Sequence, residues 1–100
     1  MQQSLTKPFP NGALLYELIV PPKLNRLLAK MRNKDIETYK ELKGKLDRIL
    51  NDPYRNAHPL RGKYKNIWET HIKNKLLLYS INDIHHAVEL VDIIDHDELR

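Results

Sequence analysis

The sequence predicts an α+β domain with the element order β-α-α-β-β-β, an antiparallel sheet with two helices packed on one face. Three observations predict it: a short apolar segment that Pro21-Pro22 stops, apolar residues at helical spacing between residues 24 and 50, and apolar segments of strand length after residue 62. Such a layer pair leaves the other sheet face free for function. We expect one domain over residues 13–100, preceded by a flexible N-terminal arm, 1–12.

The first strand and the first helix meet at the prolines. Residues 14–20 are mostly aliphatic or aromatic, which is typical of a strand. A helix is expected to begin near Pro22, because proline is tolerated in the first helical turn, where its missing N–H has no partner. Four apolar residues then follow at helical spacing on one face: Leu24, Leu27, Leu28 and Met31.

A longer second helix is predicted after a break at residues 33–35. Asn and Asp at such a break can accept hydrogen bonds from the first free N–H groups of the next helix. Helical spacing continues through Ile36, Tyr39, Leu42, Leu46, Ile49 and Leu50, and Pro53 ends it. Gly44 lies inside this helix at a cost of about 1 kcal/mol relative to alanine, which close packing would explain.

The last third of the chain predicts a three-stranded antiparallel meander. Residues 52–62 have the composition of a loop. From Lys63 the pattern alternates with a period of two, as in a half-buried strand, up to a tip at Asn74-Lys75. Residues 76–81 are nearly continuous apolar sequence, as in a central strand, and residues 87–94 form the last strand after a turn at Asn82-Asp83.

Composition excludes several classes of site. The chain of 100 residues is 41% hydrophobic and 30% charged, which is typical of a globular domain, and it has no cysteine. Disulfides, thiolate metal sites and cysteine nucleophiles are excluded, and a reducing, cytoplasmic compartment is expected. No apolar run is long enough to span a membrane, and we expect no membrane partner and no signal peptide.

The net charge of +4 is unevenly distributed. Residues 1–75 carry 16 Lys and Arg against 7 Asp and Glu, whereas residues 76–100 carry 1 against 6. The excess is sharpest over residues 53–75, where Glu69 is the only acid among six cations: Arg55, Arg61, Lys63, Lys65, Lys73 and Lys75. Clustered cations attract polyanions, although a solvated basic face is an equally good interpretation of charge alone.

Three histidines are candidates for acid–base chemistry. His58 precedes the meander, His71 lies near the end of its first strand, and His96 follows its last strand. Histidine suits proton transfer near neutral pH. Two such groups and fixed cations are what metal-independent RNA cleavage requires: one imidazole takes the proton of a ribose 2′-OH, the other protonates the leaving 5′-oxygen, and Lys or Arg stabilises the phosphorane.

Other motifs predict less. A lone histidine on a strand is more often structural than catalytic, and His85-His86 reads as a pair of exposed turn residues. A zinc site among the histidines and aspartates of residues 85–97 ranks low, because no helical ligand pair such as HExxH occurs. Trp68 and Tyr64 could stack on bases but share a predicted face that favours core packing. The three isolated glycines form no phosphate-binding loop.

Several short motifs resemble those of the RelE/ParE superfamily of toxins from toxin–antitoxin modules, and within it most closely the YafQ type of RelE-like mRNA interferase. They are His58-Pro59-Leu60-Arg61-Gly62, Trp68-Glu69-Thr70-His71-Ile72, Leu77-Leu78-Tyr79-Ser80-Ile81, and His96 with Leu99. The resemblance covers about 85 residues and includes the predicted order of elements.

The resemblance implies a type II toxin that acts as a ribosome-dependent mRNA endonuclease and inhibits translation until a cognate antitoxin protein binds it. The implied partners are mRNA, the ribosome and the antitoxin, with no metal and no small-molecule cofactor. His58, His71 and His96 match the catalytic positions. Glu69 and Tyr79 are possible supporting residues.

The sequence departs from the family at charged positions. Asn74 or Lys75 replaces an expected acid, Leu76 replaces an arginine, and Asp92 replaces a basic residue of the last strand. Phosphate and RNA contacts then fall to the cations already described: Arg61, Lys63, Lys65, Lys73 and Lys75.

Two alternatives stay open. One is a ParE-like toxin that inhibits a topoisomerase through protein contacts and needs none of the histidines. The other is a degenerate relative that binds RNA through its cations without cleaving it.

Overall fold

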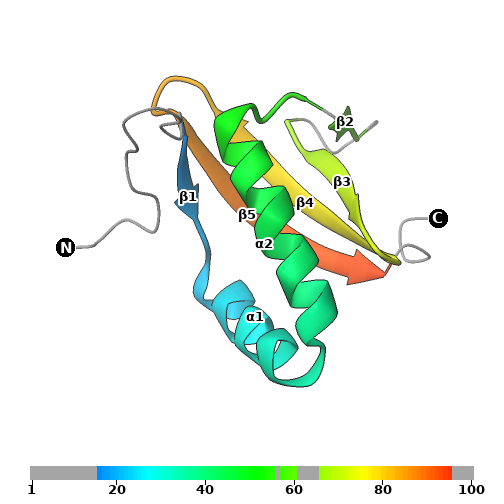
Figure 1. The fold of residues 1–100 in the computed structure, drawn as a ribbon. Coiled ribbons are helices and arrows are strands. Elements are labelled where there is room, and N and C mark those ends of the chain that lie inside the picture. Colours follow the sequence, from blue (N-terminus) through cyan, green and yellow to red (C-terminus); the bar gives the residue numbers. More distant parts are fainter. Residues whose placement is uncertain (1–15, 56, 61–65, 96–100) are drawn as a thin grey trace.

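The computed structural model describes residues 16–55, 57–60 and 66–95. In this part of the chain two helices lie on one side of a five-stranded sheet (Figure 1). The elements are β1 (Glu17–Ile19), α1 (Pro22–Lys34), α2 (Ile36–Asn51), β2 (His58–Pro59), β3 (Trp68–Ile72), β4 (Lys75–Asn82) and β5 (Ala87–Asp95). The predicted α+β class, with both helices on one face, is confirmed.

The sheet order β1-β5-β4-β3-β2 corrects two details of the prediction. The sheet is mixed rather than antiparallel throughout, because β1 pairs in parallel with β5. The segment predicted as a loop over residues 52–62 contains β2, a two-residue edge strand that pairs with β3. A strand of two residues, one of them proline, leaves no periodic signal in the sequence.

The helices begin and end where the sequence predicts. Pro22 occupies the first turn of α1. The Asp35 side chain caps α2, where its Oδ1 accepts a hydrogen bond of 3.3 Å from the Thr38 N–H. Gly44 lies in the α2 interior, and a Cβ added there would meet nothing within 4 Å. Close packing therefore does not explain this glycine.

One hydrophobic core fills the space between the helices and the sheet. Its most deeply buried side chains come from both helices and from the three long strands: Leu24, Leu42, Ile72, Leu77, Tyr79, Val88 and Leu90. Ile72 and its alternate neighbours on β3 face this core, as Trp68 packs against it and Thr70 is buried. Glu69 and His71 must then face the opposite side of the sheet, because successive residues of a strand alternate in direction.

Turns at both ends of β4 confirm the predicted meander. β3 and β4 are joined at Lys73 and Asn74, where Lys73 has a φ of 55°. The β4–β5 turn contains His85 and His86, both exposed as expected. β3 begins at Trp68, and Asn66, with a φ of 60°, lies in a turn before it. The predicted start of this strand at Lys63 lies outside the described residues.

Candidate functional site

His58 and Glu69 are cross-strand partners on β2 and β3. Partners in an antiparallel pair project to the same face. Since Glu69 and His71 alternate with the core-facing residues of β3, all three of these side chains lie on the sheet face opposite the helices. His58 and His71 are exposed and Glu69 is partly buried. A diagonal cross-strand relationship places two side chains about 7–8 Å apart, so the structure brings together two predicted catalytic histidines and a predicted supporting carboxylate.

Apolar residues of β4 lie beside this group. Leu76 is the register partner of His71 and Leu78 is the partner of Glu69. Both leucines are buried but lie outside the main core cluster, as expected of the opposite face. Two strands away, Asp92 pairs with Leu78, so the row that starts at His58 ends at a second carboxylate. The described part of this face is therefore apolar and acidic around the two imidazoles.

Four predicted site residues lie outside the described residues: His96, Arg61, Lys63 and Lys65. Asp95, the residue before His96, is the register partner of Lys75, which in turn pairs with Ile72. The end of β5 is therefore at the same end of the sheet as His71. That His96 approaches the other two histidines stays a prediction, because His96 is outside the described residues.

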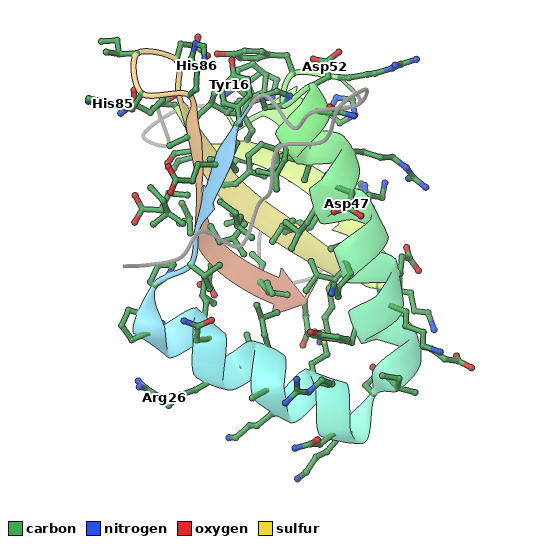
Figure 2. The ribbon with its side chains drawn as sticks, turned by 60° about the vertical axis from the view of Figure 1, so that its left-hand side comes forward. Tyr16, Arg26, Asp47, Asp52, His85 and His86 are labelled. Atoms are coloured by element: carbon green, nitrogen blue, oxygen red, sulfur yellow. The ribbon has the colours of Figure 1, made fainter. Side chains whose placement is uncertain are left out.

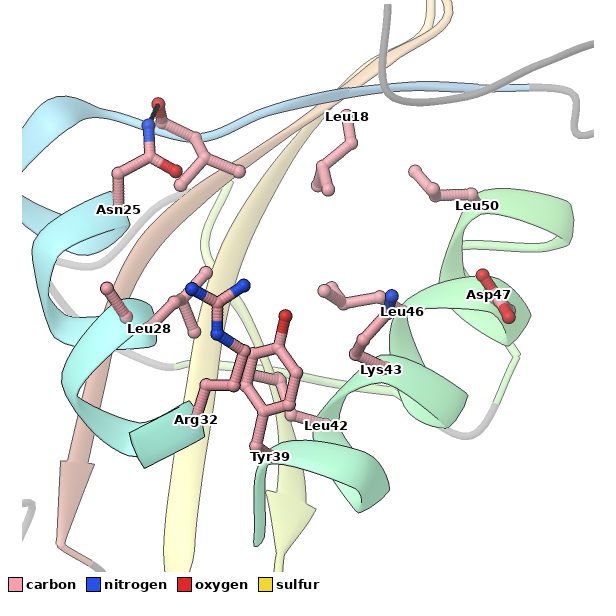
Figure 3. A pocket seen from close by; sticks show the side chains of 12 residues that line it. Leu18, Asn25, Leu28, Arg32, Tyr39, Leu42, Lys43, Leu46, Asp47 and Leu50 are labelled. Carbon is pink, nitrogen blue, oxygen red and sulfur yellow. Dashed lines mark hydrogen bonds between the residues drawn. The ribbon is translucent and has the colours of Figure 1, made fainter. Parts of the chain in front are cut away.

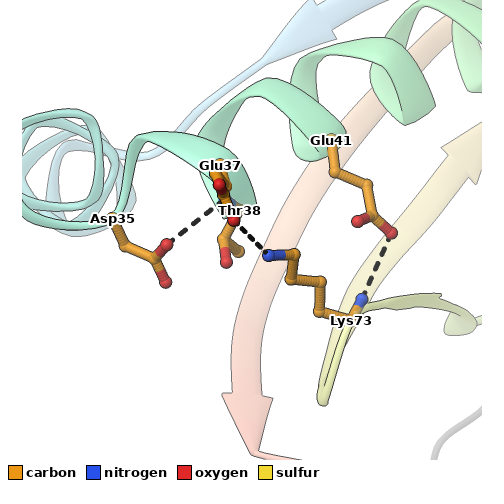
Figure 4. Close-up of polar contacts among 5 residues, drawn as sticks. All are labelled: Asp35, Glu37, Thr38, Glu41 and Lys73. Atoms are coloured by element: carbon orange, nitrogen blue, oxygen red, sulfur yellow. Dashed lines mark hydrogen bonds and ion pairs between the residues drawn. The ribbon is translucent and has the colours of Figure 1, made fainter.

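The two described cations of the predicted set bind carboxylates. Lys73 Nζ lies 3.2 Å from Glu37 Oε1 on α2, and the Lys73 N–H donates a 3.2 Å hydrogen bond to Glu41 Oε2 (Figure 4). Lys75 Nζ lies 2.9 Å from Asp95 Oδ1. These contacts tie the β3–β4 turn to α2 and β4 to β5. They reduce the share of each cation that is available for RNA.

Tyr79, a possible supporting residue of the predicted site, is buried in the core and cannot contact RNA directly. Its side chain is 0% exposed, so no RNA can reach it. Its hydroxyl donates a 3.0 Å hydrogen bond to the carbonyl of Pro53, and burial raises its pKa to about 12. Tyr54 adds an edge contact to the Trp68 ring, with the centroids 5.1 Å apart. Together these contacts fix the segment that leads into β2 and thus help to position His58.

A carboxylate in the β4–β5 turn makes a contact that sequence reasoning missed. Asp83 accepts hydrogen bonds from the hydroxyls of Tyr16, at 2.7 Å, and Tyr54, at 2.6 Å. These bonds lower the pKa of Asp83 and raise that of Tyr54 to about 12. Tyr16 also contacts the His86 ring, with the centroids 5.3 Å apart, and Figure 2 shows both at the same end of the molecule as Asp52. Asp83 is 29 positions from Tyr54 and 67 positions from Tyr16, so these hydrogen bonds leave no local signal in the sequence.

A groove of about 380 Å³ opens between β1, α1 and α2. Figure 3 shows leucines from all three elements around it, with Arg32 and Tyr39 at one side. Its apolar lining includes Leu18, Leu28, Leu42, Leu46 and Leu50, and its charged residues are Arg32, Lys43 and Asp47. The groove lies on the helix side of the sheet and is thus separate from the face that carries the histidines.

The described residues offer no group of three histidine, aspartate or glutamate side chains that could hold a metal ion. Within the same ranges, neither helix has the length and apolar character needed to cross a membrane.

Comparison with known proteins gives one sequence relative and several shared folds. A Methanocaldococcus jannaschii protein named "Putative toxin RelE4" is 29% identical over 89 residues, which cover 85% of this chain and 90% of that protein. No protein-family model matches the chain.

Two solved structures illustrate the likeness of the fold. The YoeB/ParE toxin from Agrobacterium tumefaciens superimposes with a TM-score of 0.70 at 13% identity, covering 79% of this chain and 97% of that one. The toxin–antitoxin complex RelBE2 from Mycobacterium tuberculosis contains a chain that matches with a TM-score of 0.62 at 25% identity, covering 80% and 96%. The sequence match and the shared fold agree with each other and with the motifs: the chain is similar in sequence to a protein named as a RelE toxin and shares the fold of RelE-like toxins.

Proposed function

We propose that this protein is the toxin of a type II toxin–antitoxin module and that it cleaves mRNA on the ribosome, as the YafQ-type resemblance implies. The observation that carries the proposal is the β2–β3 register, which puts His58 and His71 on one sheet face. Glu69 on the same face is the cross-strand partner of His58. The curated relative carries a toxin name, and a similar chain is part of a toxin–antitoxin complex.

The proposed reaction needs two proton transfers. One imidazole removes the proton of the ribose 2′-OH, whose oxygen attacks the adjacent phosphorus, and the other imidazole protonates the 5′-oxygen as its bond to phosphorus breaks. His58 and His71 are the described candidates for these roles, and His96 is the third. The nucleophile comes from the RNA, so the step requires no serine or cysteine. In this proposal no metal takes part.

Charge stabilisation at the phosphate is assigned to cations near the histidines. Developing negative charge on the phosphorane calls for fixed positive groups. Lys73 and Lys75 have carboxylate partners, so Arg61, Lys63 and Lys65 take the main part in this proposal. Glu69, directly across from His58, is assigned to orient that imidazole.

The antitoxin is assigned to the groove between β1, α1 and α2. Its leucine lining fits the apolar face of an amphipathic helix, which is a common mode of peptide recognition. The lining of the groove has two cations, Arg32 and Lys43, and one carboxylate, Asp47, so its net charge is positive. We therefore expect the antitoxin to insert a helix with aliphatic anchors flanked by acidic residues.

A ParE-like topoisomerase inhibitor is the second candidate. The observation that favours it is the acidic character of the described histidine face, where Glu69 and Asp92 would repel RNA phosphates. Such a toxin would act through protein contacts and would not depend on His58 or His71.

Induction in cells separates the two candidates. The protein is expressed from a tightly controlled promoter, and incorporation of labelled amino acids and labelled thymidine is followed after induction. The nuclease proposal predicts that protein synthesis stops first and that the double variant His58→Ala/His71→Ala relieves the arrest. Early arrest of DNA synthesis that persists in the double variant would instead favour the topoisomerase inhibitor.

A further inference from the structure

A second cationic site lies on the opposite side of β3 from the histidines. A cavity of about 430 Å³, called here the α2–β3 pocket, opens between the C-terminal half of α2, the segment after it, and β3. Its cations are Lys45 and Arg48 from α2 and Arg55 from the segment before β2. Asp52 is the one carboxylate in its lining, so the charged groups sum to a clear positive excess.

The three cations have no carboxylate partner among the residues that the structure describes, where the ion pairs are those of Lys73 and Lys75. Lys45 and Arg48 are three positions apart on α2, a spacing that places them on the same side of the helix. Unpaired cations that converge on one cavity attract an anion, and an arginine fork matches a phosphate group with two parallel hydrogen bonds.

The floor of the pocket adds a polar group to an apolar base. Ile49 and Thr70 both line it and are both buried, at 4% and 5% exposure. The Thr70 hydroxyl has no hydrogen-bond partner among the described residues. Because every fully buried side-chain polar atom in these residues does have a partner, the Thr70 oxygen is not fully buried and retains some exposure. The hydroxyl is therefore free to donate to an oxygen atom of a ligand in the pocket.

The pocket and the histidine face lie back to back across β3. Thr70 points to the helix side, whereas Glu69 and His71, its neighbours in sequence, point to the other side. Among the described residues, the outer neighbour of β3 in the sheet is β2, a two-residue edge strand. A single strand of RNA that places one phosphate at His58 and His71 can reach the pocket by passing around this short edge.

We propose that the α2–β3 pocket binds a backbone phosphate of single-stranded RNA beyond the cleaved nucleotide. This inference rests on the proposed function, which supplies the RNA. The pocket thereby acts as a non-specific anchor that fixes the path of the strand around the β2 edge, because phosphate contacts position a nucleic acid without reading its sequence.

The test measures binding without cleavage. The full-length protein is titrated into a fluorescent 12-nucleotide 2′-O-methyl RNA, which has no attacking hydroxyl, and anisotropy is recorded between 50 and 200 mM KCl. The pocket variant is Lys45→Gln/Arg48→Gln/Arg55→Gln. The matched control is Lys23→Gln/Arg26→Gln/Lys30→Gln, which removes the same charge from exposed positions of α1. Figure 2 shows Arg26 at the end of the molecule away from Asp52.

We expect the pocket variant to bind about tenfold more weakly or worse at 50 mM KCl, and the control to stay within about twofold of the wild type. Each phosphate that is no longer neutralised flattens the slope of log affinity against log salt by about 0.7 for a single strand, so loss of the one phosphate in the pocket predicts a change of about 0.7. Arg48→Lys keeps the charge and should keep the slope. Equal losses in both triple variants, or no binding by the wild type, would overturn the inference.

A parallel cleavage assay on ribosome-bound mRNA separates this inference from the nuclease proposal. A wild type that binds through the pocket but leaves ribosome-bound mRNA intact would support the pocket and refute the nuclease. A wild type that cleaves mRNA but whose salt slope does not depend on the three cations would refute the pocket alone.

Discussion

The hydroxyl of Tyr54 donates a 2.6 Å hydrogen bond to Asp83, joining the segment before β2 to the turn between β4 and β5. Tyr16 donates to the other oxygen of the same carboxylate. One exposed side chain therefore links three segments that are distant in sequence, and one of them leads directly to His58.

Asp83 is predicted to support the fold at neutral pH and to lose that effect in acid. The hydrogen bonds from Tyr54 and Tyr16 lower its pKa in the folded state. A depressed pKa contributes stability above the unfolded value of about 3.9, and this contribution is lost as the pH falls through the folded value. Denaturant unfolding of the wild type and of Asp83→Asn from pH 7 to pH 3 should show a stability difference that narrows with acid. A difference that stays constant would contradict the contact.

Tyr54 and Tyr79 are predicted to ionise late. Hydrogen bonding to Asp83 raises the first pKa to about 12 and burial raises the second to about 12. A raised tyrosine pKa stabilises the folded state below pH 10, and the effect is lost as the pH rises through 12. Ultraviolet titration should therefore show tyrosines that ionise above pH 10, Tyr16 among them because Asp83 also raises its pKa, with one fewer in Tyr54→Phe. If every tyrosine ionised near pH 10 while the protein was still folded, neither the Tyr54–Asp83 hydrogen bond nor the burial of Tyr79 would be supported.

Tyr79→Phe tests the anchor of the segment before β2. The change removes the buried hydrogen bond to the Pro53 carbonyl, and we expect the free energy of unfolding to fall by about 1–2 kcal/mol. Tyr39→Phe is the matched control, because the Tyr39 hydroxyl makes no hydrogen bond within the described ranges. Urea unfolding of both variants gives the comparison, and equal effects would show that the Pro53 bond contributes nothing.

Gly44→Ala is predicted to stabilise the protein by about 1 kcal/mol. Glycine inside a helix costs about that much relative to alanine, and a Cβ at this position meets nothing within 4 Å. For a domain of this size the melting temperature should rise by about 4–8 °C. A melting temperature that is unchanged or lower would mean that this position is constrained by something other than helix propensity.

Much of the fold can be predicted from local patterns. Pro22, the Asp35 cap and the leucines of α2 predict the helices, because helix signals repeat within a few residues. The parallel pairing of β1 with β5 could not be predicted in the same way, since Leu18 and its partner Val88 are 70 positions apart. The sequence did not predict β2, because two residues are too few to show the alternation of apolar and polar side chains that marks a strand.

In the candidate site, too, some features can be predicted from the sequence and others depend on distant contacts. Residue type and motif identify His58 and His71 as candidates, and the register then brings them to one face. The burial of Tyr79 and the carboxylate partners of Lys73 and Lys75 depend on packing across the fold. An alternating strand pattern does not reveal which cations a distant helix will bind, so the pattern of charge overestimates the free cations at the β3–β4 turn.

The central claim is that His58 and His71 together perform acid–base cleavage of mRNA. The direct measurement is primer extension on an mRNA bound in purified translating ribosomes, after addition of the wild type, His58→Ala, His71→Ala or His85→Ala. His85 is the control because it is an exposed histidine in the β4–β5 turn. We predict cleavage by the wild type and His85→Ala, and a rate at least about 100-fold lower in the other two, as expected for the loss of a general acid or base. Cleavage at the wild-type rate by His58→Ala and His71→Ala, or no cleavage by the wild type, would contradict the claim.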